Sequence, residues 1–286
     1  MRRYGSEAND RWLGFEHRPG DIVISTRSKC GTTWVQMACA LLVLQTPDLP
    51  APLGEISPWL DWDIEPLADV AERLDRQEHR RIIKTHTPLD GLPLRSDVTY
   101  LVVGRHPLDV AVSLYHHGQN IDRARVAELT GRPEQTSPTE PFAGWFPTWM
   151  DPAASIDEEL DTLPGLAHHL SDAWDRRGEP NVVLLHYRDL ADDTEGAMRG
   201  MAARLGIEVP EEAWPDLVAA ASFEAMRERA EERAPDRLGV LADRQAFFRS
   251  GRSGEGTHLV IGEARQAYDE QAGALLAPDL LAWLAR

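Results

Sequence analysis

Cysteine, positive charge and long apolar runs are all scarce in this 286-residue sequence. Its two cysteines, Cys30 and Cys39, are too few for a disulfide framework and are typical of a reduced, cytoplasmic protein. The longest apolar run, residues 37–44, is far shorter than the roughly 20 residues that a membrane-spanning helix needs. No apolar segment follows Arg2 and Arg3, so we expect neither a signal peptide nor a membrane anchor.

The balance of charge limits the partners that the chain can have. It contains 30 basic and 47 acidic residues, a formal net charge of -17 at pH 7. We therefore expect neither nucleic acid nor a membrane surface as a partner, and an anionic small molecule must be held by local positive groups. The length suits one large α/β domain, and we predict a single domain over residues 1–286.

Short apolar runs alternate with segments of helical periodicity along the chain. The predicted strands cover residues 22–24, 82–84, 98–104 and 182–185. The predicted helices cover residues 34–42 with one apolar stripe, 69–80, a segment that begins at Pro107, 166–177, a segment from an Asp193 cap to Gly206, and 211–220. This alternation predicts a P-loop-like α/β domain, in which helices cover both faces of a central parallel sheet.

Residues 21–34 are the most informative stretch, because they read as a buried strand, a tight turn and the start of a helix. Gly31 lies at the turn, where a glycine lets backbone N–H groups approach an anion, and Lys29, Thr32 and Thr33 add a charge and two hydroxyls. The common nucleotide-binding loop places its lysine directly after the last glycine, whereas Lys29 precedes Gly31 by two residues. This order argues against an ordinary ATPase or kinase loop. Taken alone, the stretch could equally be a structural turn with a solvated lysine.

A long segment without clear periodicity, residues 118–157, interrupts the alternation. It contains five prolines and an aromatic cluster, namely Pro133, Pro138, Pro141, Pro147, Pro152, Phe142, Trp145, Phe146 and Trp149. We predict a loop-rich insertion. The aromatic cluster is interpreted either as a lid over a binding site or as a satellite core.

Six short motifs occur in one order along the chain. They are Arg27-Ser28-Lys29-Cys30-Gly31-Thr32-Thr33-Trp34, Lys84-Thr85-His86, the stretch from Gly104 to Ser113 that contains Arg105-His106-Pro107, Tyr187-Arg188-Asp189-Leu190, Ala221-Ser222-Phe223-Glu224-Ala225-Met226, and Phe248-Arg249-Ser250-Gly251. Together they resemble the cytosolic-type sulfotransferases, which transfer a sulfuryl group from 3′-phosphoadenosine 5′-phosphosulfate (PAPS) to a hydroxyl or amine. The resemblance covers residues 21–254 and implies the P-loop-like fold and this activity.

The resemblance also implies roles for individual residues. His86 would be the general base, Lys29 would stabilise the leaving 3′,5′-bisphosphate, and Lys84 would orient the sulfuryl oxygens. The donor would contact Lys29, Cys30, Gly31, Thr32, Thr33, Trp34, Arg105, Ser113, Tyr187, Ser222, Phe223, Arg249, Ser250 and Gly251. The acceptor would lie against Trp59, Trp62 and His86, and an apolar or aromatic small molecule would suit these tryptophans. No metal is expected, because lysines and backbone donors can stabilise a sulfuryl group, which carries less charge than a phosphoryl group.

The chain departs from the family pattern at several positions. Arg27, Ser28 and Cys30 replace the usual tyrosine, proline and serine, which implies a less rigid start of the loop. Ser250 replaces a lysine, so one positive contact to the 3′-phosphate is missing. Two alternatives therefore stay open, an ATP-dependent small-molecule kinase and a nucleotide-binding protein without catalytic activity. Acceptor identity and oligomeric state are open as well.

Overall fold

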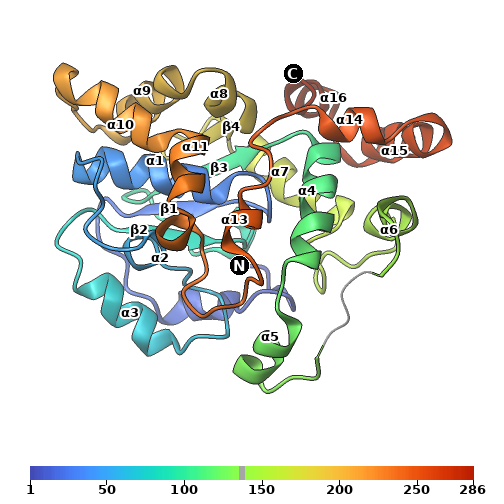
Figure 1. The fold of residues 1–286 in the computed structure, drawn as a ribbon, viewed down its shortest axis with the longest axis horizontal. Coiled ribbons are helices and arrows are strands. Elements are labelled where there is room, and N and C mark those ends of the chain that lie inside the picture. The colour runs from blue at the N-terminus through green and yellow to red at the C-terminus, as the bar shows by residue number, and fades with distance from the viewer. Residues whose placement is uncertain (135–138) are drawn as a thin grey trace.

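The computed structural model describes residues 1–134 and 139–286 and is built around a four-stranded parallel sheet (Figure 1). The strands are β1 (Ile22–Ser25), β2 (Ile82–Thr85), β3 (Thr99–Gly104) and β4 (Val182–His186), in the spatial order β2-β1-β3-β4. Ile22 of β1 pairs with Ile82 of β2 and with Thr99 of β3. All four predicted strands are thus confirmed, and the α/β fold with a central parallel sheet is as predicted.

Helices connect and cover the strands. In chain order the helices are η1 (Asn9–Gly14), α1 (Thr32–Leu44), α2 (Leu53–Ile56), α3 (Leu67–Asp75), η2 (Leu89–Gly91), α4 (Pro107–Gln119), α5 (Arg123–Thr130), α6 (Phe142–Trp149), α7 (Leu163–Asp175), α8 (Tyr187–Asp192), α9 (Thr194–Leu205), η3 (Glu211–Ala213), α10 (Trp214–Ala221), α11 (Phe223–Glu228), α12 (Ala230–Arg233), α13 (Arg244–Phe247), α14 (Glu255–Leu259), α15 (Gly262–Leu275) and α16 (Pro278–Leu284).

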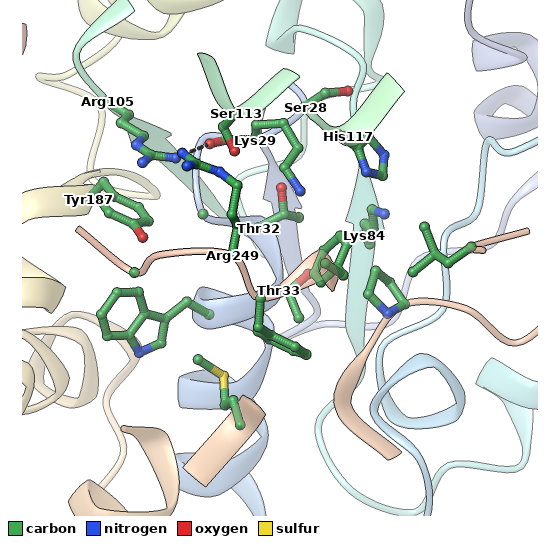
Figure 2. A pocket seen from close by; sticks show the side chains of 18 of the residues that line it. Ser28, Lys29, Thr32, Thr33, Lys84, Arg105, Ser113, His117, Tyr187 and Arg249 are labelled. Carbon is green, nitrogen blue, oxygen red and sulfur yellow. Dashed lines mark hydrogen bonds between the residues drawn. The ribbon is translucent and has the colours of Figure 1, made fainter. Parts of the chain in front are cut away.

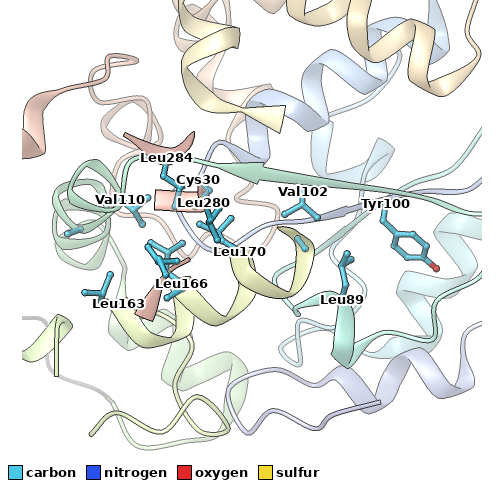
Figure 3. Close-up of a cluster of buried hydrophobic side chains, with 14 of the residues drawn as sticks. Cys30, Leu89, Tyr100, Val102, Val110, Leu163, Leu166, Leu170, Leu280 and Leu284 are labelled. Carbon is cyan, nitrogen blue, oxygen red and sulfur yellow. The ribbon is translucent and has the colours of Figure 1, made fainter. Parts of the chain in front are cut away.

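The sheet separates two hydrophobic cores, because successive strand side chains point to opposite faces. On one face Val23 and Val102 join a cluster with residues of α4, α7, α15 and α16, and Figure 3 shows α7 lying under the sheet there. On the other face Ile22, Ile24 and Leu101 join a second cluster with residues of α1, α9 and α10. Both faces are apolar and covered, as a parallel sheet requires.

The predicted single apolar stripe on the first helix is wrong. Every residue of α1 from Thr32 to Leu42 is buried. The reason is that α1 lies between the sheet and a second layer of helices, α2, α9 and α10, so it has almost no solvent face. Its N-terminus is therefore held rigidly at the end of β1.

Helix ends follow the predicted signals in several places. Pro107 begins α4, the Asp193 carboxylate accepts the Gly196 N–H at 2.8 Å at the start of α9, and Gly206 ends α9 in the left-handed region. The prediction for 69–80 is wrong at its end, because α3 stops at Asp75 and the Arg80 guanidinium donates instead to the carbonyls of Gly20 and Leu205.

The last two helix predictions need smaller changes. The helix predicted over 166–177 is α7, which begins at Leu163 because the Thr162 hydroxyl accepts the Gly165 N–H at 3.2 Å. The helix predicted over 211–220 begins as the short helix η3 and continues as α10.

The segment 118–157 is more regular than predicted, since its described residues include α5 and α6. Pro138 lies outside the described residues. Phe146 and Trp149 of α6 are buried in the same hydrophobic cluster as α4 and α7. The aromatic residues of this segment thus belong to the core, and none of them lines the cavity described next.

Candidate active site

One cavity lies at the carboxyl ends of β1, β2 and β3, where the motifs named above meet (Figure 2). Its predicted lining residues are Lys29, Gly31, Thr32, Thr33, Trp34, Trp59, Trp62, Lys84, His86, Arg105, Ser113, Tyr187, Phe223, Arg249, Ser250 and Gly251. We call the part formed by Lys29, residues 31–34, Arg105, Ser113, Tyr187, Phe223 and residues 249–251 the cationic half. The part formed by Trp59, Trp62, Ile121, Met226, Pro235, Val240 and Leu241 is called the apolar half.

The loop from β1 to α1 has the strained geometry of an anion-binding turn. Lys29 has a φ of 66° and Gly31 a φ of 108°, both in the left-handed region. A Cβ atom at Gly31 would lie only 2.7 Å from Cδ2 of Tyr187. Glycine is therefore required at this position for two reasons, its backbone conformation and the close approach of an aromatic ring.

The start of this loop is held by an ion cluster around the buried Arg27 that we call the loop clamp, formed by Glu7, Arg27 and Asp161. Arg27 is 3% exposed, and its guanidinium binds Glu7 at 3.0 Å and Asp161 at 2.6 Å. Asp161 also accepts the Ser28 hydroxyl at 2.9 Å, and Arg27 donates to the carbonyl of His86. Where the family pattern has tyrosine and proline rings, Arg27 and Ser28 thus form polar bonds, which oppose the expected loss of rigidity.

Lys29 and Lys84 face the cavity with their amino groups on aromatic rings. Nζ of Lys29 lies 3.9 Å from the ring centre of Phe247, and Nζ of Lys84 lies 3.8 Å from that of Trp59. Burial lowers the pKa of each lysine to about 7, and for Lys29 the positive charge of Arg105 adds to this effect. Among the described ion pairs none involves Lys29 or Lys84. Both cations thus lack a carboxylate partner.

His86 is held in one tautomer by the backbone. Its Nδ1 atom faces the carbonyl oxygen of Thr26, which only accepts hydrogen bonds, so Nδ1 must carry the proton. Nε2 then keeps a free lone pair. Burial, followed by the charges of Lys84 and Arg27, lowers the pKa of His86 well below its ordinary value, so the ring is neutral near pH 7. The ring also meets Trp59 edge-on at 4.5 Å.

Arg105 crosses the cationic half above Tyr187. Its Cζ atom lies 4.1 Å from the tyrosine ring centre, and its two terminal nitrogens donate to the carbonyls of Lys29 at 2.9 Å and Arg252 at 3.2 Å. Its Nε atom is buried without a hydrogen-bond partner. Ser113, two turns into α4, lines the same wall. A free guanidinium N–H beside a hydroxyl is a suitable pair of donors for a phosphate.

The loop after α13 closes the cationic half from the other side. The carboxylate of Asp109 accepts the N–H groups of Gly254 at 2.7 Å and Gly256 at 2.8 Å, which ties the loop to α4. Arg249 forms an ion pair with Glu255. Gly251 has a φ of 65° and lies under the ring of Phe223, where a Cβ atom would come within 2.5 Å.

Three aromatic rings lie together at the edge of the cationic half. Trp34 meets Tyr187 edge-on at 5.5 Å and Phe223 at 6.2 Å. The indole N–H of Trp34 donates to the carbonyl of Ala221 at 2.8 Å, which fixes its ring. These three rings form a surface on which a flat base can stack.

Two predicted site residues do not reach the cavity. The Cys30 side chain is fully buried in the hydrophobic core, as Figure 3 shows, and burial raises the pKa of its thiol to about 12. Ser222 uses its hydroxyl to accept the N–H of Ala225 at the start of α11. Both side chains are therefore committed to the fold.

Sequence reasoning missed most of the apolar half and several residues between the halves. The missed lining residues are Ser28, His117, Ile121, Met226, Pro235, Val240, Leu241, Phe247 and Phe248. His117 could have been found, because it follows Ser113 by four residues and so lies on the same face of a helix. Ser28, Met226 and Phe248 lie inside the named motifs but had no predicted role in the site, and the other missed residues come from segments with no periodic pattern.

The described residues show neither a metal cluster nor a membrane span. Outside residues 135–138, no group of three or more His, Cys, Asp or Glu side chains is placed to hold a metal ion. Over the same part of the chain, no helix is both long enough and apolar enough to cross a membrane.

Comparison with known proteins identifies the family. The model of the sulfotransferase domain matches residues 19–271. The chain belongs to the sulfotransferase family. This result confirms the resemblance drawn from the motifs and decides against the kinase alternative. A glycolipid sulfotransferase of Mycobacterium bovis (strain BCG / Pasteur 1173P2) is 40% identical to this sulfotransferase over an alignment of 296 positions, which covers 96% of this chain and 90% of the relative.

More distant relatives agree with this assignment. Sulfotransferase 1 family member D1 of Rattus norvegicus is 27% identical over an alignment of 252 positions, which covers 84% of this chain and 78% of the relative. The crystal structure of mouse sulfotransferase SULT7A1 complexed with PAP has 21% sequence identity and a TM-score of 0.70, and the match covers 99% of this chain and 95% of that one. The two proteins share the fold.

Proposed function

We propose that this sulfotransferase transfers the sulfuryl group of PAPS to a hydroxyl group of an acceptor with an apolar body. The observation that carries the proposal is the pair of cavity-facing ammonium groups, Lys29 and Lys84, which make no ion pair with any described residue. An enclosed cation without a counter-charge is unfavourable, and an anionic substrate supplies that charge. A phosphosulfate would lie between the two lysines.

The remaining parts of the cationic half fit the nucleotide of this donor. Arg105, with its unpartnered Nε, and Ser113 would bind the 3′-phosphate. Trp34, Tyr187 and Phe223 would pack the adenine. The N-terminus of α1 and the turn at Gly31 would bind the 5′-phosphate with backbone N–H groups. The mouse enzyme with the same fold is complexed with PAP, which supports this placement.

The chemistry follows from the tautomer of His86. Nε2 of His86 takes the proton from the acceptor hydroxyl as the acceptor oxygen attacks sulfur. The bond between sulfur and the bridging oxygen of the 5′-phosphate breaks, and its electron pair leaves with that oxygen, next to the Lys29 ammonium. Lys84 would orient the sulfuryl oxygens. The two lysines supply the positive charge for this in-line transfer, so we propose that it needs no metal.

The lining of the apolar half indicates the general chemical character of the acceptor. Trp59 and Trp62 stack at 4.8 Å with an interplanar angle of 13°. Ile121, Met226 and Leu241 complete an apolar wall beside them. An acceptor with an apolar or aromatic body would bury that body here. The 40% identical relative is a glycolipid sulfotransferase, which is compatible with an acceptor hydroxyl on a largely apolar molecule.

Calorimetric titration with 3′-phosphoadenosine 5′-phosphate (PAP) tests the donor site. We expect PAP to bind without metal and in EDTA, and Arg105→Ala to weaken it about 100-fold, because a charged hydrogen-bond donor to the 3′-phosphate is lost. Arg95→Ala, which removes a surface arginine paired with Asp97, is the matched control. If the protein prefers ATP with magnesium and Arg105→Ala does not change this binding, the assignment of PAPS as the donor is wrong. Binding of PAP without turnover of any acceptor would favour the non-catalytic alternative.

A further inference from the structure

His117 is a second histidine in the cavity, and the mechanism above does not use it. It lies on α4, one turn beyond Ser113 and one turn before Ile121, and so at the boundary between the cationic and the apolar half. Its Nδ1 atom is shut off from solvent and has no hydrogen-bond partner. By contrast, Nδ1 of His86 is bound to the backbone. Over residues 1–134 and 139–286, no group therefore selects a tautomer of His117.

The surroundings of His117 place it beside the reacting groups. Figure 2 shows its ring reaching from α4 towards the amino groups of Lys29 and Lys84. Burial, followed by the charges of these two lysines, lowers its pKa well below the ordinary value, so the ring is neutral near pH 7. Phe247 meets it edge-on at 5.8 Å. A neutral imidazole can both donate and accept a hydrogen bond.

His86 and His117 both lie near the amino group of Lys84. Nζ of Lys84 lies 3.8 Å from the ring centre of Trp59, which the His86 ring meets edge-on at 4.5 Å, and Figure 2 shows the His117 ring reaching towards the same amino group. A hydroxyl bound to His117 would accordingly lie close to the hydroxyl that His86 deprotonates. An enclosed polar atom without a partner in the protein calls for an explanation, and a cavity ligand provides one.

We infer that His117 binds a second hydroxyl group of the acceptor, adjacent to the one that is sulfated, and so selects acceptors that carry vicinal hydroxyl groups. This inference rests on the proposed function and narrows its acceptor to a diol on an apolar body. A catechol-like ring and a sugar headgroup on an apolar chain both have this chemistry. His117 is thus a specificity-determining residue.

Matched acceptors test this role. With PAPS as donor, kcat/KM is measured for 2,3-dihydroxynaphthalene and for 2-naphthol, which differ by one vicinal hydroxyl. We expect the wild-type protein to prefer the diol at least about tenfold, because a site that binds a hydroxyl discriminates against the analogue that lacks it. His117→Phe keeps the ring shape and is expected to reduce the ratio to about one. His117→Asn, which keeps a donor and an acceptor, should retain part of the preference.

His116→Phe is the control, because His116 is the exposed neighbour on α4 and does not line the cavity. Its diol preference should equal that of the wild type. A second arm compares octyl β-D-glucopyranoside with 1-octanol and distinguishes a sugar from a catechol-like acceptor. PAP affinity, measured on each variant, verifies that the donor site is intact.

Each remaining outcome counts against the inference. A wild-type ratio near one for both acceptor pairs, or a ratio that His117→Phe leaves unchanged, overturns the role of His117. If none of the four acceptors is sulfated while PAP binds, the diol assignment is wrong although the donor site stands. Failure of PAP to bind would instead remove the proposed function itself.

Discussion

The two halves of the cavity are held in different ways. In the cationic half, buried or partly buried side-chain bonds tie several segments together, as when Arg105 donates to the carbonyl of Lys29 and Asp109 accepts the N–H groups of Gly254 and Gly256. In the apolar half, residues 235–241 are tied to the rest by backbone bonds at 2.9 Å from the Asp122 N–H to Val240 and from the Ala242 N–H to Asn120, and by ion pairs near the surface, such as Arg237 with Glu55 and Glu65. A single bridge joins Ile121 to Leu241.

This difference between the two halves matches what each half must do in the reaction. Transition-state charge is stabilised only by donors that are already in position, so the half that contacts the reacting group needs buried, well-ordered bonds. Apolar contacts are non-directional and tolerate shifts of the wall. We therefore expect changes in the cationic half to alter turnover and donor affinity strongly, and changes at the edge of the apolar half to alter acceptor KM weakly.

Replacement of His86 should give the largest effect of all. His86→Ala removes the free Nε2 acceptor at the junction of the two halves, and we expect kcat with PAPS and 2-naphthol to fall about 1000-fold. PAP affinity should stay close to the wild-type value, because His86 faces the acceptor. His258→Ala, an exposed histidine on α14, is the control. Wild-type turnover at saturating PAPS in His86→Ala would show that another group is the base.

Gly31→Ala tests how closely the cationic half is packed. The added Cβ would lie 2.7 Å from Tyr187 and would need a φ of 108°, so either the loop or the ring must move. We expect PAP to bind about 30-fold to 100-fold more weakly. Gly131→Ala provides the comparison, since its φ is also positive, 67°, but the space around it is open. Equal PAP affinities in these two variants would mean that neither the backbone conformation of Gly31 nor its contact with Tyr187 matters for donor binding.

The loop clamp should control the pH range of donor binding. The pKa of Lys29 is about 7, so its ammonium is present below pH 7 and is lost as the pH rises, and PAP affinity should fall up to tenfold per unit above pH 7. The charge of Asp161 raises the pKa of both Lys29 and Lys84. Asp161→Asn should therefore move the fall in PAP affinity to lower pH, so that PAP binds several-fold more weakly at pH 8.

Asp157→Asn serves as the comparison for the clamp, because Asp157 is an exposed acid paired with Arg2. Its profile of PAP affinity against pH should match that of the wild type. If Asp161→Asn weakens PAP equally at every pH, the carboxylate acts only by holding the loop, and its charge has no influence on the lysines.

The two halves also differ in how far the sequence predicts them. The cationic half comes from short motifs at strand ends, and because parallel strands end at one edge of the sheet, Lys29, Lys84 and Arg105 could be placed together without a structure. The errors there concern side-chain direction. Cys30 follows Lys29 directly, yet the turn directs it into the core, and no pattern in the sequence reveals this.

The apolar half depends on contacts between distant segments. Ile121 and Leu241 are joined only by a bridge between positions 120 residues apart, and neither position shows helical or alternating periodicity. The loop clamp is similar, because Glu7 lies 20 residues before Arg27 in the sequence and Asp161 lies 134 residues after it. Such tertiary pairings follow from the packing of the whole domain, so local rules did not predict them.

The weakest expected effect concerns the ion pairs behind the apolar half. Arg237 lies in the segment that carries Pro235, Val240 and Leu241, and its exposed guanidinium binds Glu55 at 2.5 Å and also Glu65. Exposed ion pairs contribute little because solvent and salt screen them. Arg237→Gln should therefore raise KM for 2-naphthol only about twofold to threefold and leave PAP affinity unchanged. Added salt should raise the wild-type KM and reduce the difference between the two proteins.

Arg199→Gln, which breaks a surface pair with Glu211 away from the cavity, should change neither constant. A large loss of PAP affinity in Arg237→Gln would show that the two halves are mechanically coupled, and the division drawn between them would then be wrong.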